Sequence, residues 1–266
     1  MNAIDAVFQR LRAAGKKALI PFLTAGDPDL AATARLIREL AANGASLIEI
    51  GFPYSDPLAD GPVIQASYTR ALGKKVRFDD ILKCLSDVRD AGVPLVAMLS
   101  YSLILPRGAD AFVKQAQNAG LSGAIVPDLP MEEAAALAAI TKIRDFKLIQ
   151  LVTPATPHDR AVQIARLSSG FLYYVSVTGI TGERDRLPES LLRELTWLRS
   201  HTDLPICVGF GISKPEHARM LREVADGIIV GSAFVRRLEE AGQRPFSALA
   251  KDMTELARSL AAALNP

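Results

Sequence analysis

Short apolar runs recur along the whole chain, and each is rich in β-branched or aromatic residues. None alternates clearly between apolar and polar residues, which is typical of strands that are covered on both faces. The pattern therefore predicts eight buried β-strands. They occupy residues 17–23, 46–52, 94–99, 122–128, 147–152, 170–177, 204–210 and 226–231.

Amphipathic helical patterns lie between these runs. In residues 29–44 the apolar positions recur at helical spacing, Asp27 or Asp29 suits the N-terminal cap, and Gly44 suits the end. The same pattern predicts further helices over residues 109–120, 131–145, 158–168, 189–200 and 214–224. The N-terminal segment, residues 1–17, reads as an additional amphipathic helix.

Alternation of eight strands with helices predicts a (β/α)8 TIM barrel, with an open doubly wound sheet as the alternative. The spacing of the strands is regular and no Pro/Gly/Ser-rich linker divides the chain, so we expect one domain over residues 1–266. Enzymes with this fold place their chemistry on the loops that follow the strands. Functional residues are therefore expected after each apolar run.

Composition narrows the classes of function. Lys and Arg number 31 against 29 Asp and Glu, and the basic residues are scattered, so no nucleic-acid-binding stripe is expected. No apolar run approaches the roughly 18 residues of a membrane helix. The N-terminus lacks a signal-peptide core. These features predict a cytoplasmic protein without a membrane span.

Cysteines and histidines give no sign of a metal site. Cys84 and Cys207 lie in apolar surroundings and are expected to be buried, reduced thiols. His158, His201 and His217 lack the spacing of metal ligands. No metal is therefore expected.

Glu49 interrupts an apolar strand, between Ile48 and Ile50. Alternate residues of a barrel strand point inward, and a carboxylate there is costly unless it is partnered or used. Burial raises a carboxyl pKa towards neutrality, as an acid–base catalyst requires. Glu49 is either a catalytic group or a buried glutamate paired with a cation or a backbone amide.

The loop after Glu49 carries two acids among prolines. Asp56 and Asp60 alternate with Pro53, Pro57 and Pro62, which stiffen the path of the chain. A stiff loop can hold carboxylates at fixed positions for catalysis. A turn or a helix cap is the structural alternative for each acid.

Three glycine-containing loops follow the last three strands. They are residues 176–186, 209–213 and 230–235, and the last begins a short extra helix with Ser232 near its start. Glycines let a backbone approach an anion closely, and helix N-termini attract phosphate. The three loops favour a phosphate site, although each alone could be a tight turn. Residues 177–187 also have the composition of a mobile lid or of a surface loop.

These motifs together resemble the tryptophan synthase α subunit family over almost the whole length. The matching segments are PFLTAGDPD (21–29), IEIGFPYSDPLADGPVIQ (48–65), VPDLP (126–130), VSVTGITG (175–182), VGFGIS (208–213) and VGSAFV (230–235). The resemblance implies a (β/α)8 lyase that splits indole-3-glycerol phosphate into indole and glyceraldehyde 3-phosphate. It implies no metal and no cofactor in this chain.

The resemblance also assigns roles. It implies that Glu49 is the proton-transferring carboxyl group and that Asp60 offsets the positive charge that develops on the indole ring. Further positions match the family's substrate site: Phe22 and Tyr173 at the indole pocket, Thr181 on the lid, and Gly182, Gly211, Gly231 and Ser232 around the phosphate with Phe210 beside them.

A protein partner is implied too. Asp56, Pro57 and Pro130 match segments that face a β subunit, which carries pyridoxal phosphate (PLP) and receives the indole in an α2β2 complex. One stretch departs from the family, since residues 100–103 read Ser-Tyr-Ser-Leu in place of Tyr-x-Asn-Pro. This departure puts substrate packing and coupling to the β subunit in question.

Three alternatives to a two-protein α subunit stay open. The chain could be a free-standing lyase, a non-catalytic regulatory subunit of the β partner, or an isomerase on a similar phosphate-binding barrel. An intact Glu49/Asp60 pair argues against the regulatory subunit, and the loop of prolines and acids argues against the isomerase.

Overall fold

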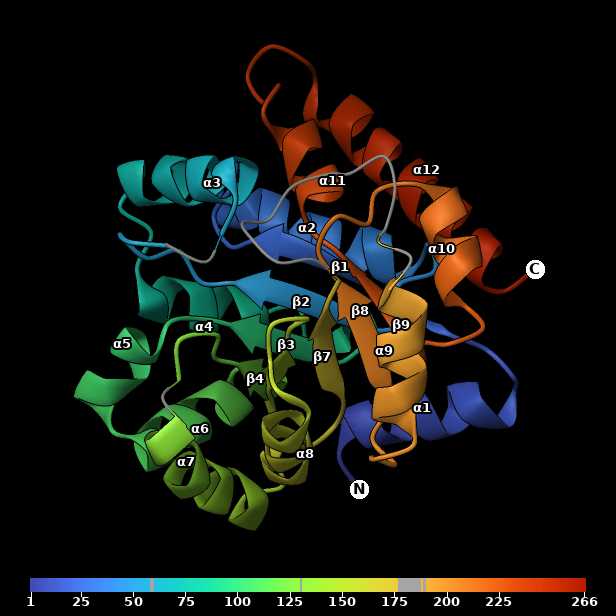
Figure 1. Ribbon diagram of the computed structural model, residues 1–266. Coiled ribbons are helices and arrows are strands. Elements are labelled where there is room, and N and C mark those ends of the chain that lie inside the picture. The colour runs from blue at the N-terminus through green and yellow to red at the C-terminus, as the bar shows by residue number, and fades with distance from the viewer. Residues whose placement is uncertain (58–59, 130, 177–187, 189) are drawn as a thin grey trace.

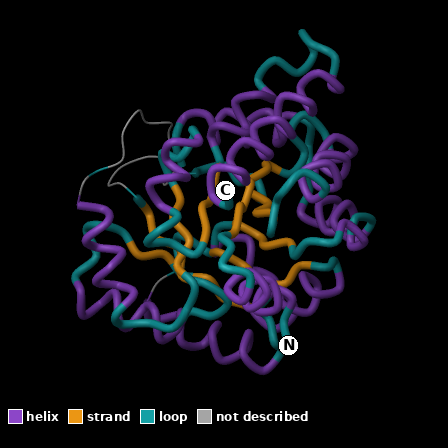
Figure 2. Tube along the Cα trace, turned by 90° about the vertical axis from the view of Figure 1, so that its right-hand side faces the viewer, coloured by secondary structure: helices purple, strands orange, loops and turns teal. Residues whose placement is uncertain are grey.

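The computed structural model describes residues 1–57, 60–129, 131–176, 188 and 190–266. Its strands lie at the centre of the molecule and its helices surround them (Figure 1; Figure 2). The strands are β1 Ala18–Thr24, β2 Ile48–Gly51, β3 Leu95–Met98, β4 Leu121–Ile125, β5 Lys147–Ile149, β6 Leu151–Val152, β7 Leu172–Val175, β8 Ile206–Gly209 and β9 Gly227–Val230. The paired strands are all parallel.

The sheet closes through the predicted fifth strand, which is split into β5 and β6 at Gln150. β5 pairs with β4 at one end of the strand order and β6 pairs with β7 at the other end. The split follows from the hydrogen bonding of Gln150, whose N–H donates to Ser168 Oγ at 3.1 Å. Because one chain segment joins both ends of the sheet, the nine strands form the predicted eight-stranded TIM barrel.

Helices cover the outside of the barrel. They are α1 Ala3–Ala13, α2 Leu30–Ala41, α3 Pro62–Gly73, α4 Phe78–Ser86, α5 Tyr101–Ile104, α6 Ala109–Asn118, α7 Met131–Ile143, α8 His158–Leu167, α9 Ser190–Arg199, α10 Pro215–Leu221, α11 Ser232–Val235 and α12 Phe246–Leu264, with short 3₁₀ turns at Arg89–Ala91, Leu105–Arg107 and Arg236–Leu238. The predicted helices are confirmed to within a few residues, and α3, α4, α5 and α12 are additional to them.

The start of α2 shows how two neighbouring acids take different roles. The side chain of Asp29 accepts a hydrogen bond from the Ala32 N–H at 2.7 Å and caps the helix. Asp27 is buried and forms a bidentate ion pair with Arg70 of α3, at 2.9 and 2.7 Å. A buried charge needs such a partner, so Asp27 is unavailable as a cap. The pair ties the β1–α2 loop to α3.

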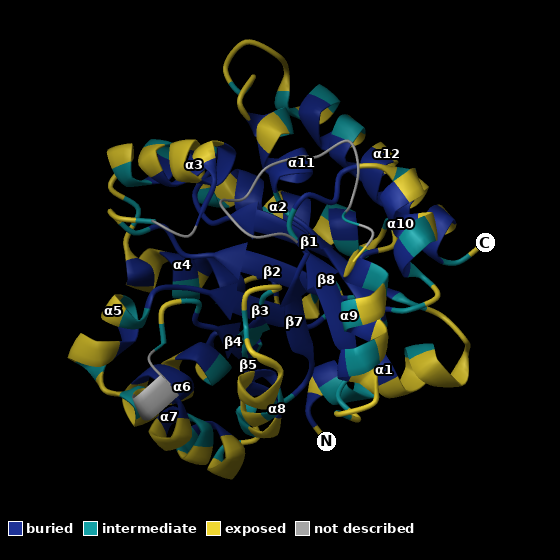
Figure 3. Ribbon diagram, viewed as in Figure 1, coloured by how far each residue is buried: buried dark blue, intermediate teal, exposed yellow. Residues whose placement is uncertain are grey.

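Two apolar clusters lie on the two sides of the strands. The strands are mostly buried (Figure 3), and among their residues only Ser122, Lys147 and Leu151 are partly exposed. In β2, Ile48 and Ile50 belong to the outer cluster, which packs against the helices. Residues of a strand alternate between faces, so Glu49 points into the barrel. The neighbouring sequence therefore decides the direction of this carboxyl group.

Helix α1 closes the N-terminal end of the barrel. Its residues Ile4, Val7 and Phe8 belong to the interior cluster, and Phe8 packs against Phe171 with ring centroids 5.7 Å apart. The preceding Asn2 side chain donates to the backbone carbonyl oxygens of Ser122 in β4 and of Asp145, just before β5. With this end filled, a cavity inside the barrel has its opening at the C-terminal ends of the strands.

Two further expectations concern burial and the membrane. Both cysteines are free and buried, as predicted. Among the described helices, none combines the length and the apolar character needed to span a bilayer.

Candidate active site

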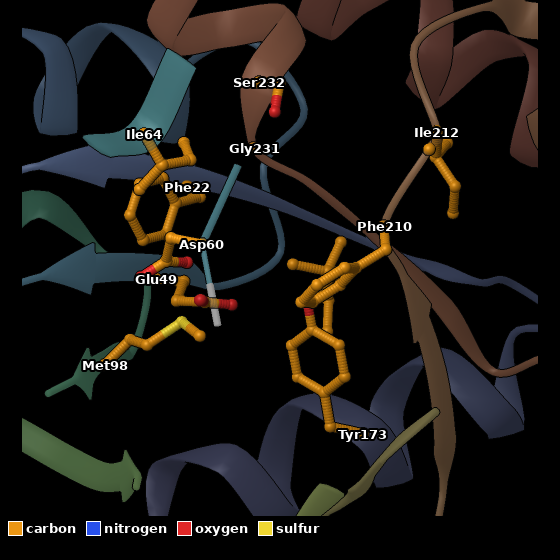
Figure 4. A pocket seen from close by; sticks show the side chains of 12 residues that line it. Phe22, Glu49, Asp60, Ile64, Met98, Tyr173, Phe210, Ile212, Gly231 and Ser232 are labelled. Atoms are coloured by element: carbon orange, nitrogen blue, oxygen red, sulfur yellow. The ribbon is translucent and has the colours of Figure 1, made fainter. Parts of the chain in front are cut away.

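A pocket of about 450 Å³ opens at the C-terminal ends of the strands. It draws residues from β1, β2, β3, β7 and β9 and from the loops after β2, β8 and β9 (Figure 4). It is lined by Phe22, Glu49, Asp60, Ile64, Met98, Tyr173, Phe210, Gly211, Ile212, Ile229, Gly231 and Ser232. The structure thus brings together residues from opposite ends of the sequence, such as Phe22 and Ser232.

Glu49 is almost completely buried, with 1% of its surface exposed. Its neighbours across the sheet are Phe22 on β1 and Val96 on β3. In the described part of the chain no cation pairs with Glu49, and its Oε2 atom has no hydrogen-bond partner. Burial raises its pKa to about 8, and the charge of Asp60 adds to the rise. Glu49 therefore carries a proton at neutral pH, and the alternative of a cation-paired structural glutamate finds no partner among these residues.

Asp60 projects into the same pocket from the loop before α3, next to Glu49 in Figure 4. Gln65 holds this loop, because its side-chain amide donates to the carbonyl oxygens of Asp60 at 2.7 Å and Pro57 at 3.2 Å. Burial raises the pKa of Asp60 to about 6. At neutral pH the pair thus consists of one protonated and one ionised carboxyl group, the division of roles that acid–base catalysis uses.

Aromatic rings form the apolar walls, and glycines on the strands make room for them. A Cβ atom on Gly51 would lie 2.3 Å from Cζ of Phe22, and a Cβ atom on Gly209 would lie 2.1 Å from Oη of Tyr173. The rings of Tyr173 and Phe210 meet edge to face with centroids 6.0 Å apart. The walls suit a flat apolar ring, because aromatic side chains pack well on such surfaces.

Four apolar lining residues are absent from the sequence prediction: Ile64, Met98, Ile212 and Ile229. Met98 and Ile229 occupy inward positions of β3 and β9. In sequence they look like any core residue, and no signal distinguishes a residue that lines a cavity from one that fills the barrel.

At the rim of the pocket opposite Glu49 and Asp60, the backbone of the loops after β8 and β9 faces the cavity. Gly231 precedes the first residue of α11, Ser232, and both line the pocket. The first N–H groups of a helix have no partner within the helix, so they can face an anion. Gly211 also lines the pocket, and it follows Phe210; both have left-handed φ angles, of 72° and 71°. For Phe210 this conformation costs roughly 1–2 kcal/mol because it has a Cβ atom.

The other predicted residues either fall outside the described part of the chain or do not line the pocket. Thr181, Gly182 and the proposed lid 177–187 fall outside the described residues, as does Pro130. Asp56 is exposed on the loop before Asp60 and accepts a hydrogen bond from the Ser55 hydroxyl at 2.6 Å. Pro57 precedes the loop segment outside the described residues and does not line the pocket.

The segment that departs from the family pattern sits beside the pocket rather than in it. The Asp128 carboxylate holds the start of this segment, because it accepts hydrogen bonds from the Ser100 hydroxyl at 2.6 Å and from the Tyr101 N–H at 2.7 Å. None of the residues 100–103 lines the pocket. The departure therefore leaves the described lining of the pocket unchanged.

Metal binding finds no support in the described residues, where no three His, Cys, Asp or Glu side chains gather closely enough to hold an ion. The chemistry visible in the pocket is that of two carboxyl groups with separated pKa values. Fold and pocket together define a (β/α)8 barrel enzyme of the acid–base type.

Comparison with known proteins specifies the family. The family profile "Tryptophan synthase alpha chain" matches residues 8–265. A tryptophan synthase alpha chain from Rhodopirellula baltica is 48% identical over 276 residues, which covers 100% of this chain and 99% of that one. Another, from a Synechocystis species, is 50% identical over 242 residues and covers 90% and 92%. The chain belongs to the tryptophan synthase alpha chain family, whose members cleave indole-3-glycerol phosphate.

Solved structures agree with this assignment. Tryptophan synthase subunit alpha from Legionella pneumophila superposes with a TM-score of 0.90 at 36% identity, over 100% of this chain and 99% of that one. A chain of tryptophan synthase from Mycobacterium tuberculosis gives a TM-score of 0.90 at 33% identity, over 100% and 99%. The barrel is therefore shared with these proteins over its full length.

Proposed function

We propose that Glu49 and Asp60 catalyse the cleavage of indole-3-glycerol phosphate into indole and glyceraldehyde 3-phosphate in this chain, acting within a single barrel domain. The observation that carries this proposal is the pair of buried carboxyl groups in one pocket, with pKa values of about 8 and about 6. A retro-aldol cleavage requires a proton donor and a fixed negative charge at the same time. These two groups supply both at neutral pH.

The reaction follows from their protonation states. Protonated Glu49 donates its proton to C3 of the indole ring, and the positive charge that develops on the ring is offset by ionised Asp60, which accepts a hydrogen bond from the ring N–H. The resulting Glu49 carboxylate removes the proton of the glycerol hydroxyl next to the ring. The bond between C3 and the glycerol chain then breaks, its electron pair returns to the ring, and an aldehyde and neutral indole are formed.

Binding divides between the two ends of the pocket. The indole ring lies against Phe22 and Tyr173, which are apolar and flat. The phosphate lies at the rim, on backbone N–H groups of Gly211, Gly231 and Ser232, where Phe210 borders the site. By resemblance, Gly182 and Thr181 complete the site from the segment 177–187.

The reaction in this chain uses no cofactor of its own, and PLP belongs to the β subunit with which the α chain pairs. We infer that the pair forms an α2β2 complex in the cytoplasm and that the loop bearing Asp56 and Pro57 faces the β subunit together with Pro130. Asp56 and Pro57 belong to the loop that carries Asp60, and the Gln65 amide bonds to the carbonyl oxygens of both Pro57 and Asp60. Indole would leave the pocket on this side.

The decisive experiment incubates the purified chain with indole-3-glycerol phosphate, alone and with a β subunit, and quantifies indole and glyceraldehyde 3-phosphate. Equal amounts of both products are expected, with faster turnover when the β subunit is present. A Glu49→Gln/Asp60→Asn double variant sets the background. Absence of indole under both conditions contradicts the proposal and leaves the regulatory subunit, and isomerised substrate would favour the isomerase. Fast turnover that the β subunit does not accelerate favours the free-standing lyase.

A further inference from the structure

The loop after β8 has an unusual backbone at the point where it meets the pocket. Phe210 and Gly211 have successive φ angles of 71° and 72°. A left-handed φ is rare for a residue with a bulky side chain, and it persists only where the surrounding structure holds it. The contacts that hold this loop therefore decide which way its N–H groups point.

Ser176 provides the first of these contacts. It follows β7 directly, is 1% exposed, and its N–H donates to the carbonyl oxygen of Gly209 at 2.9 Å. Its hydroxyl donates to the next carbonyl oxygen, that of Phe210. Because a trans peptide is planar, its C=O and N–H groups point in opposite directions. By fixing the Phe210 carbonyl, Ser176 also fixes the direction of the Gly211 N–H.

His217 holds the other end of the loop. It is 4% exposed in the first turn of α10, and its Nδ1 atom accepts a hydrogen bond from the Ser213 N–H at 3.3 Å. Only Gly211 and Ile212 lie between Phe210 and Ser213, and both line the pocket. Neither Ser176 nor His217 lines it. They act on the pocket through the loop.

We propose that Ser176 and His217 are positioning residues that fix the backbone of residues 210–213, so that the Gly211 N–H is oriented for the substrate phosphate before it binds. The inference rests on the proposed function, since it assumes that the phosphate occupies this rim. A loop already in its bound conformation loses less conformational freedom when the anion binds. Loss of the Ser176 or the His217 hydrogen bond therefore weakens binding of the substrate phosphate more than binding of the indole ring.

The test measures dissociation constants for two separate probes, inorganic phosphate for the rim and indole for the ring pocket. Ser176→Ala removes the hydroxyl with little change in volume, and His217→Ala removes the acceptor. His217→Asn keeps an acceptor atom at the place of Nδ1 and is the rescue variant. The matched controls are Thr141→Val, which removes a buried hydroxyl that bonds to Ala138, and His201→Ala, which removes an exposed imidazole just after the end of α9.

We expect Ser176→Ala and His217→Ala to raise the Kd of inorganic phosphate and the KM of the substrate by about tenfold, which corresponds to about 1.4 kcal/mol. The Kd of indole and the kcat at saturating substrate should stay within about twofold, less than about 0.5 kcal/mol. His217→Asn should restore phosphate binding, and both controls should behave as the parent protein. Thermal unfolding of every variant checks that the fold is intact.

Two results overturn the inference. One is an equal loss of phosphate and indole affinity, which indicates a general effect on the fold. The other is unchanged phosphate affinity in both Ser176→Ala and His217→Ala. If instead the parent protein binds indole but not phosphate, the proposed phosphate rim itself is wrong and the inference fails with it. Phosphate binding to the parent protein thus tests the proposed phosphate rim, and the variants test the positioning role of Ser176 and His217.

Discussion

The two ends of the pocket solve different problems with different chemistry. At one end Glu49 and Asp60 are ionisable side chains, buried so that their pKa values rise to about 8 and about 6. At the other end Gly211 and Gly231 contribute only backbone, whose partial charges do not titrate. The chemical step therefore depends on side chains and on pH, while anion binding depends on the shape of the chain. Variants at the two ends should separate turnover from binding.

The largest effect is expected for Glu49→Gln, which keeps the shape of the side chain but removes its proton transfer. Cleavage should fall by about 10³-fold or more, within the range found for general acid–base groups. Binding of inorganic phosphate at the rim should be unchanged. Steady-state indole release and phosphate titration measure the two quantities. Retention of more than about a tenth of the activity, a deficit under ~1.4 kcal/mol, contradicts the role of Glu49.

Asp60→Asn comes next, with an expected loss of about 10²-fold in kcat, because an amide can still bind the ring N–H but cannot offset its charge. Asp90→Asn is the control, since Asp90 is exposed and pairs with Arg38 on the outer surface. Both variants are compared by kcat at saturating substrate. A larger loss than that of Glu49→Gln would reverse the roles given to the two carboxyl groups.

The pH dependence should be bell-shaped in kcat/KM. Activity needs ionised Asp60 and protonated Glu49, so it rises as the pH passes about 6 and falls as it passes about 8. Beyond each limb the rate should change about tenfold per pH unit. Because the two carboxyl groups interact, the two apparent pKa values read from this profile belong to the pair and not to one residue each. In Asp60→Asn the upper limb should move to lower pH, since the charge of Asp60 helps to raise the pKa of Glu49.

Binding of sulfate, an anion whose charge does not change over this range, extends the same comparison to the rim. Its Kd should vary with pH much less than kcat/KM does. A sulfate affinity that follows the same two limbs would show that the rim and the carboxyl groups are not separate in function.

The smallest expected effect is a change in stability, and it separates two glycines, Gly209 and Gly231. In Gly209→Ala the new Cβ atom would lie 2.1 Å from Oη of Tyr173, so we expect a loss of about 1–3 kcal/mol in the free energy of unfolding. In Gly231→Ala the nearest atom is Cβ of Phe22 at 3.7 Å, an ordinary contact. Its stability should stay within about 0.5 kcal/mol of the parent protein. Urea unfolding of both proteins is the measurement, and equal stabilities would mean that the strand glycine does not make room for the ring.

Much of the site follows from local pattern. The apolar neighbours Ile48 and Ile50 force Glu49 inward, and the strand–loop alternation puts Asp60 and the glycine loops after β8 and β9 at the same end of the barrel. The reaction, cleavage of indole-3-glycerol phosphate, followed only from the resemblance to the tryptophan synthase α subunit family. The apolar lining residues Met98 and Ile229 had no such signal, because a residue that faces a cavity and a residue that fills a core have the same side chains.

The sequence by itself determined which segments become strands, that these strands are covered on both faces, and that a carboxyl group would lie inside the barrel, because these properties depend on neighbours along the chain. Only the tertiary structure decided that the strand interrupted at Gln150 closes the sheet, that Asp27 pairs with Arg70, and that Ser176 and His217 hold the loop at Phe210. Apart from the local hydrogen bond between Ser213 and His217, these contacts join segments that are distant in the chain. Periodicity tells which side of an element is covered, whereas the packing of the whole barrel selects what covers it.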